Sequence, residues 1–171
     1  RLYFVIWFEH RKPGKGNTIM NVKFKDVVDG RVLERRFNIG EKLEDVRVER
    51  RPYQYLYKEG EDYIFMNQET YEQVPIGHNL ITGVEFLKEG FVCDVVIDAS
   101  TETILFAELP TKVELQVAYT EPGLKGDTAT NTLKPAKLET GAEIRVPLFI
   151  NEGEKIQVDS RTGEYLGRVK E

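Results

Sequence analysis

The sequence has one cysteine and two histidines among its 171 residues, and neither type points to a reactive centre. A single cysteine cannot form an intramolecular disulfide, and Cys93 lies in the apolar run 91–97, which is typical of a small buried side chain. His10 and His78 are far apart and fit no zinc or iron ligand spacing. These absences predict a metal-free protein without a disulfide framework.

Long apolar runs are also missing. None approaches the roughly 20 residues that a membrane-spanning helix needs. The apolar start, residues 1–8, is too short for a signal peptide and has no small-residue cleavage site, so we expect it to form a strand. We therefore expect a cytoplasmic protein. Because the first residue is not methionine, we also expect that an N-terminal segment precedes this chain.

The sequence does contain regular alternation of apolar and polar residues. Met20, Val22 and Phe24 alternate with polar neighbours, and the pattern recurs over residues 113–119. A period of two is typical of half-buried strands. Turn-forming pairs separate the runs: Pro13-Gly14, Asp29-Gly30, Glu59-Gly60, Glu89-Gly90, Pro122-Gly123, Glu152-Gly153 and Thr162-Gly163. The only helical candidate is the short stretch 80–88, so we predict an all-β fold.

Charge divides the chain into three parts. Residues 1–45 carry 10 basic and 7 acidic side chains, residues 46–110 carry 5 and 12, and residues 111–171 carry 9 and 10. The net charges are therefore +3, −7 and −1. A basic first third beside a strongly acidic middle indicates separate modules with separate partners. We expect three small barrels of about 60 residues each, which stabilise one another.

Residues 10–17, His-Arg-Lys-Pro-Gly-Lys-Gly-Asn, lie between two strand-like runs and predict a hairpin tip. Pro13 fixes one backbone angle, while Gly14 and Gly16 allow conformations that other residues avoid. Lys15 would then project from the apex with no neighbouring side chain to shield it. Local physics leaves two interpretations open: a solvated turn lysine, or a cation that enters a narrow, phosphate-rich site.

Blocks along the whole chain, in the same order, resemble bacterial elongation factor P, which is related to the hypusine-containing translation factor of archaea and eukaryotes. The blocks are residues 12–16 (Lys-Pro-Gly-Lys-Gly), 55–60, 65–67, 69–73, 122–128, 134–136, 138–142, 146–150 and 159–168. The resemblance implies three consecutive small β-barrels in an L-shaped, tRNA-like arrangement. Residues 1–45 would form an SH3-like (KOW-like) domain without its N-terminal strand, and residues 46–110 and 111–171 would form two OB-fold domains.

The resemblance also implies a non-enzymatic, monomeric translation factor that binds the 70S ribosome between the peptidyl-tRNA and exit sites. Lys15, supported by Pro13, Gly14 and Gly16, would reach the acceptor end of the peptidyl-tRNA and promote peptide-bond formation at consecutive prolines. The equivalent lysine is modified in many bacteria, notably by β-lysylation, so a lysine-modifying enzyme is an implied partner. No cofactor, metal or membrane is implied.

Two further sites follow from the resemblance. A third-domain loop would approach the exit-site mRNA codon, although residues 129–133 lack the paired glycines usual in the family. This loop comprises Gly126, Asp127, Thr128 and Lys134. Tyr165 and Arg168 would contribute contacts to the ribosome or tRNA near the C-terminus, although packing and solvation explain them equally well. The sequence 17–19 also departs from the commoner family pattern beside the lysine loop.

Four basic residues of the first third, Arg11, Lys12, Lys23 and Lys25, are weaker candidates for RNA contacts. Alternation places Lys23 and Lys25 on one face of a strand, where a phosphate contact and a solvated face are equally plausible. The net negative charge of the chain disfavours broad phosphate binding, so any contacts with RNA must be local.

Three alternative functions stay open. A paralogue of elongation factor P could serve different stalled sequences. A general single-stranded RNA-binding OB protein would display surface aromatics for stacking, whereas many aromatics here fall in alternating positions typical of a core. An enzyme is conceivable because carboxylates are plentiful, but the sequence shows no nucleophile–base set, phosphate loop or metal-ligand spacing.

Overall fold

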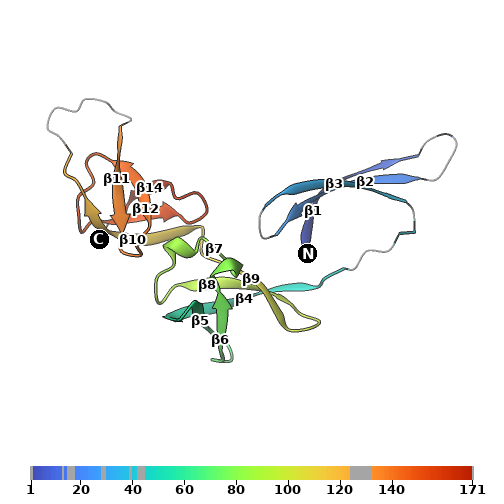
Figure 1. Cartoon of the computed structure of the whole chain (residues 1–171), viewed down its shortest axis with the longest axis horizontal. Coiled ribbons are helices and arrows are strands. Elements are labelled where there is room, and N and C mark those ends of the chain that lie inside the picture. Colours follow the sequence, from blue (N-terminus) through green and yellow to red (C-terminus); the bar gives the residue numbers. More distant parts are fainter. Residues whose placement is uncertain are drawn as a thin grey trace. The chain divides into compact units, whose positions relative to one another are not determined.

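The structure, a computed structural model, describes residues 2–12, 14, 18–27, 30–38, 40–41, 45–123 and 132–170. These residues form three β-sheets and two short 3-10 helices, which confirms the predicted all-β class (Figure 1). The chain divides into two compact units, residues 1–47 and residues 48–171. Each unit is built around its own sheets.

The first unit is an antiparallel three-stranded sheet in the order β1-β2-β3. Its strands are β1 (Tyr3–Arg11), β2 (Ile19–Asp26) and β3 (Val32–Asn38), so the apolar start of the chain does form a strand. Phe24 of β2 packs edge-on against Tyr3 and Phe37, with ring centroids 6.0 and 5.6 Å apart. This small aromatic cluster, with buried Val22, is the core of the sheet.

The second unit begins with a six-stranded sheet in the order β6-β5-β4-β8-β9-β7. Its elements are β4 (Val48–Glu59), β5 (Asp62–Asn67), β6 (Gln73–Gly77), η1 (His78–Leu80), β7 (Ile81–Thr82), η2 (Val84–Phe86), β8 (Val92–Asp98) and β9 (Thr103–Glu108). The helical candidate 80–88 therefore becomes a two-residue strand and 3-10 turns. Gly83 divides this stretch with a φ of +79°, and a Cβ there would lie 2.6 Å from the Ser160 carbonyl oxygen.

A five-stranded antiparallel sheet in the order β12-β11-β10-β13-β14 completes the second unit. Its strands are β10 (Lys112–Thr120), β11 (Leu133–Leu138), β12 (Glu143–Pro147), β13 (Lys155–Asp159) and β14 (Tyr165–Arg168). Val113, Leu115 and Val117 of β10 are buried, as the alternation predicts. Tyr119 is 57% exposed because the register shifts between Val117 and Tyr119, which exchanges the two faces of the strand.

One hydrophobic core joins the two sheets of the second unit. It includes Phe86 and Leu87 from the first sheet region together with many residues of the second. Polar bonds cross the same joint. The Thr140 hydroxyl donates to the Glu85 carbonyl at 2.7 Å, and the Ser160 hydroxyl donates to the Pro110 carbonyl at 2.7 Å. The two barrels therefore behave as one body, because separating them would expose apolar surface and leave these groups unpaired.

Cys93 is 1% exposed, which confirms its expected place in the core. Burial, with a smaller contribution from the Asp94 carboxylate, raises the pKa of its thiol to about 12. The reactive thiolate is therefore essentially absent at neutral pH. No helix in the described ranges is long and apolar enough to cross a membrane.

The joint also contains an ion pair between Lys88 and Glu139, with Nζ and Oε1 2.9 Å apart. Partial burial alone would raise the pKa of Glu139. The hydrogen bonds that it accepts from Lys88 and from the Gln116 backbone N–H outweigh this effect, so its pKa lies below the ordinary value of 4.5. A carboxylate with a depressed pKa stabilises the fold above its unfolded-state pKa, and the contribution disappears as the pH falls through the folded-state value.

We predict that Glu139→Gln lowers the unfolding free energy of the second unit by about 1 kcal/mol at pH 7, since the pair is partly exposed. Thermal unfolding across pH 2.5–7 measures the effect. The difference between wild type and variant should be constant above about pH 5 and shrink below pH 4. A difference that persists undiminished to pH 2.5 would show that the charge of Glu139 does not stabilise the joint.

Candidate functional site

The β1–β2 hairpin determines where the predicted lysine loop begins and ends. The last paired positions are Arg11 and Ile19, so seven residues, 12–18, connect the strands, and Lys15 is the fourth of them. Pro13, Lys15 and Gly16 lie outside the described residues. Gly14 is described, and no atom lies within 4 Å of the position that a Cβ would take there. The loop therefore closes an extended hairpin, with Lys15 at the middle of the connection.

The base of this loop is basic. Arg11, Lys12 and Arg36 line a shallow cavity of about 380 Å³ together with Ile19 and Asn21. Three of these five side chains carry a positive charge, which favours a phosphate or another anion. Sequence reasoning identified the first two residues but missed Arg36. Its place beside Asn21 follows from the β2–β3 register, which the sequence alone does not specify.

Lys23 and Lys25 differ in their surroundings. The Lys23 ammonium lies 5.1 Å from the centroid of the Trp7 ring, to which it is paired across the β1–β2 ladder. This cation–π contact gives Lys23 a role within the sheet. Lys25 is exposed. An RNA contact by either side chain stays a prediction.

The predicted exit-site loop is only partly described, because Gly126, Asp127 and Thr128 lie outside the described residues. Lys134, at the start of β11, is 7% exposed, and its ammonium donates a hydrogen bond to the Glu121 carbonyl oxygen. The side chain thus ties the two strands that enter and leave the loop.

Two neighbouring contacts strengthen the same stem. The Thr120 hydroxyl donates to the Pro135 carbonyl at 2.9 Å. Gly123 lies against the backbone of Leu148, where a Cβ would come within 2.6 Å of the carbonyl oxygen. The stem is therefore built from close backbone packing and buried polar bonds. Lys134 stabilises it from within instead of presenting its charge at the surface.

Tyr165 and Arg168 make separate contacts. Tyr165 lines a cavity of about 690 Å³ with Phe86 at the joint, and burial raises the pKa of its hydroxyl above 10.0. The Arg168 guanidinium stacks on the Phe149 ring at 4.5 Å and pairs with Glu154 at 3.2 Å. Both residues have structural partners, so their predicted contacts with the ribosome or tRNA stay predictions.

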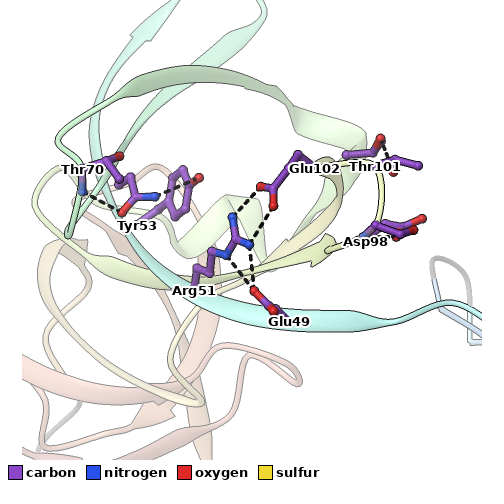
Figure 2. Close-up of polar contacts among 10 residues, drawn as sticks. Glu49, Arg51, Tyr53, Thr70, Asp98, Thr101 and Glu102 are labelled. Atoms are coloured by element: carbon purple, nitrogen blue, oxygen red, sulfur yellow. Dashed lines mark hydrogen bonds and ion pairs between the residues drawn. The ribbon is translucent and has the colours of Figure 1, made fainter.

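A polar cluster that the sequence did not reveal lies on the six-stranded sheet. Arg51 of β4 donates to Glu49 at 2.7 Å and to Glu102, in the β8–β9 turn, at 2.6 Å (Figure 2). The hydrogen bond with Glu102 is the main reason that the pKa of Arg51 is raised and that of Glu102 is lowered. Arg51, one of the few cations of the acidic middle region, is thus already paired with two carboxylates. This region is therefore a poor binding site for phosphate.

Comparison with known proteins agrees with this arrangement. Family models match along the chain: the elongation factor P KOW-like domain over residues 1–43, the elongation factor P OB domain over 48–103, and the elongation factor P C-terminal domain over 113–168. The chain belongs to the elongation factor P family. It is thus a member of a family of translation elongation factors that are generally not enzymes.

Relatives match over nearly the full chain. Elongation factor P of Phocaeicola vulgatus is 73% identical over 170 residues, which are 99% of this chain and 90% of that protein. Elongation factor P of Bacteroides fragilis (strain YCH46) is 74% identical with the same coverage. A solved structure of eukaryotic translation initiation factor 5A from Methanococcus jannaschii covers 63% of this chain and 77% of its own, at 20% identity and a TM-score of 0.47.

We predict that Lys134→Met destabilises the second unit by about 1–2 kcal/mol, because the Glu121 carbonyl loses its buried donor. Thermal or urea unfolding measures the loss. Lys137→Met is the matched control, since Lys137 lies on the exposed face of the same strand. Equal stabilities for the two variants would show that the buried ammonium does not hold the loop stem.

Proposed function

We propose that this chain binds the 70S ribosome between the peptidyl-tRNA and exit sites and promotes peptide-bond formation at consecutive prolines. It would act in the cytoplasm as a monomer. One observation carries the proposal. A Lys-Pro-Gly-Lys-Gly loop closes a long antiparallel hairpin in a member of the elongation factor P family, and Lys15 is its central residue.

The hairpin is suited to carry a loop into a confined site. β2 pairs with β1 along its whole length on one side, and with β3 along most of its length on the other side. At the usual rise of about 3.3 Å per residue, its eight residues span roughly 26 Å. A strand braced from both sides is stiffer than an isolated loop, so it supports the tip at a fixed distance from the rest of the unit.

Proline is a poor substrate for peptide-bond formation because its ring restricts the backbone. Holding two reacting groups in the productive geometry lowers the activation free energy of peptide-bond formation. A reduction of about 1.4 kcal/mol corresponds to a tenfold increase in rate. The Lys15 ammonium has three donors with which to hold the acceptor end of the peptidyl-tRNA. The protein then supplies position, while the ribosome supplies the chemistry.

The charge distribution supports a local contact with tRNA. Arg11, Lys12 and Arg36 gather at the base of the loop, where they would favour a nearby phosphate. A lysine-modifying enzyme that adds a β-lysyl or similar group to Lys15 would lengthen the side chain and extend its reach. Residues 126–128 would approach the exit-site codon, and Tyr165 and Arg168 would add contacts near the C-terminus.

We predict that Lys15→Ala reduces the rate of translation through consecutive prolines by at least about tenfold, because the positioning cation is lost. A reconstituted translation assay with cognate ribosomes measures it, using protein purified from its native host. Lys112→Ala, an exposed lysine of β10, is the control and should behave as wild type. Intact-mass measurement of the native protein shows whether Lys15 carries a modification.

Two results would contradict the proposal. Full activity of Lys15→Ala would show that this lysine is not the working tip. If the native wild-type protein leaves the pause at consecutive prolines unchanged, it acts on other stalled sequences, as expected for a paralogue.

A further inference from the structure

Two non-glycine residues in the described part of the chain have positive φ, Tyr71 at 61° and Glu102 at 55°. This left-handed conformation is unfavourable for a bulky side chain and persists only where its surroundings impose it. Both residues lie in turns of the six-stranded sheet. β5 ends at Asn67, opposite Tyr53 in the middle of β4, and β8 ends at Asp98, opposite Val48, the first residue of β4.

The conformation of Glu102 has an evident structural reason, because it brings the carboxylate to Arg51 at 2.6 Å (Figure 2). The backbone conformation of Tyr71 closes the hydrogen-bonded turn between β5 and β6, but its side chain takes no part in that turn. Its side chain is 71% exposed, and within the described residues it makes no hydrogen bond or ring contact. The turn therefore holds an aromatic ring out in solvent.

The turn that holds Tyr71 is closely hydrogen-bonded. The side-chain oxygen of the buried Asn67 accepts hydrogen bonds from the backbone N–H groups of Glu69 at 2.8 Å and Thr70 at 3.2 Å. Its side-chain NH₂ group donates to the Tyr53 hydroxyl at 3.3 Å (Figure 2). The Tyr71 N–H donates to the Asn67 carbonyl at 2.9 Å. These bonds set the backbone of Tyr71 in advance, so a partner would not have to order it.

The charge around the ring selects the kind of partner. Glu69 and Glu72 flank Tyr71, both are exposed, and the middle third of the chain has a net charge of −7. Carboxylates repel the phosphates of RNA. They attract guanidinium and ammonium groups, which also stack favourably on an aromatic face. A rigid, exposed tyrosine with complementary charge at its rim is typical of an energetic centre of a protein interface.

We propose that Glu69, Tyr71 and Glu72, the Tyr71 turn, dock on an arginine- or lysine-bearing surface of a protein in the ribosome. The inference rests on the proposed function, because that function places the partner on the ribosome. It adds a second anchor of opposite charge to the lysine loop. The basic loop base would contact RNA, and the acidic turn would contact protein.

Tyr71→Gly tests the docking site, because glycine relieves the backbone strain while it removes the ring. Binding to purified 70S ribosomes stalled at consecutive prolines should weaken about tenfold, a typical loss for an interface tyrosine. The melting temperature should stay equal or rise. Tyr57→Ser, an exposed tyrosine nearer the far end of β4, and Glu102→Gly, which relieves the other strained turn, should bind as wild type.

The paired change Glu69→Gln with Glu72→Gln should weaken binding and reduce its dependence on salt, because charge pairs at an interface rim are screened. If the Tyr71→Gly variant binds the ribosome with unchanged affinity, the docking inference is overturned. The proposed function still stands in that case, provided that the wild type binds and relieves the pause. If the wild type neither binds nor relieves the pause, both fail.

Photocrosslinking distinguishes the class of partner. With p-benzoylphenylalanine in place of Tyr71, purified 70S ribosomes should give an adduct that survives ribonuclease and contains a ribosomal protein. An adduct to ribosomal RNA would replace protein docking with base stacking and so overturn the inference. An absence of any adduct, with binding retained, would overturn it as well.

Discussion

The antiparallel pairing of β1 with β2 is the interaction on which the proposed function depends. The ladder continues to Arg11 and Ile19, so the chain must reverse within residues 12–18, and Lys15 is their midpoint. A slip of one residue would move every side chain of β2 to the opposite face. Phe24 would then leave the aromatic cluster with Tyr3 and Phe37, so the core specifies the register that centres the lysine.

In the second unit, contacts between the two small barrels stabilise both of them. A single core and several polar bonds join its two sheets, among them the Lys88–Glu139 pair and the Ser160 hydroxyl bond to Pro110. Small domains bury a limited fraction of their surface, so a shared core stabilises both. The overall negative charge of the chain is compatible with a role on RNA because the basic residues at the lysine loop are local, and the acidic turns lie elsewhere.

Much of this architecture is predictable because period-two alternation and Gly-containing turns are local signals. They correctly indicate β10 as a half-buried strand and the all-β class, and the family blocks indicate the three consecutive modules. The prediction of a helix over residues 80–88 is wrong. Gly83 interrupts the stretch, because it adopts a left-handed conformation against Ser160, a residue distant in sequence.

The site details that escaped prediction all depend on cross-strand register or long-range packing. Arg36 joins the loop base through the β2–β3 ladder. Lysine is a residue type usually found at the surface, yet the strand places Lys134 on the buried face, where its ammonium donates a hydrogen bond to the Glu121 carbonyl oxygen. Tyr119 follows the alternation in sequence, but a register shift in β10 turns it outward. None of these effects leaves a signal within a short window of sequence.

The most direct test of the central claim is a cryo-EM structure of the native protein on cognate 70S ribosomes stalled at consecutive prolines. We expect the first unit to lie beside the peptidyl-tRNA, with the β1–β2 hairpin directed at its acceptor end and density for Lys15 and any modification next to the terminal nucleotides. A hairpin directed away from the peptidyl transferase centre, with the stall still relieved, would show that Lys15 does not act by positioning the peptidyl-tRNA.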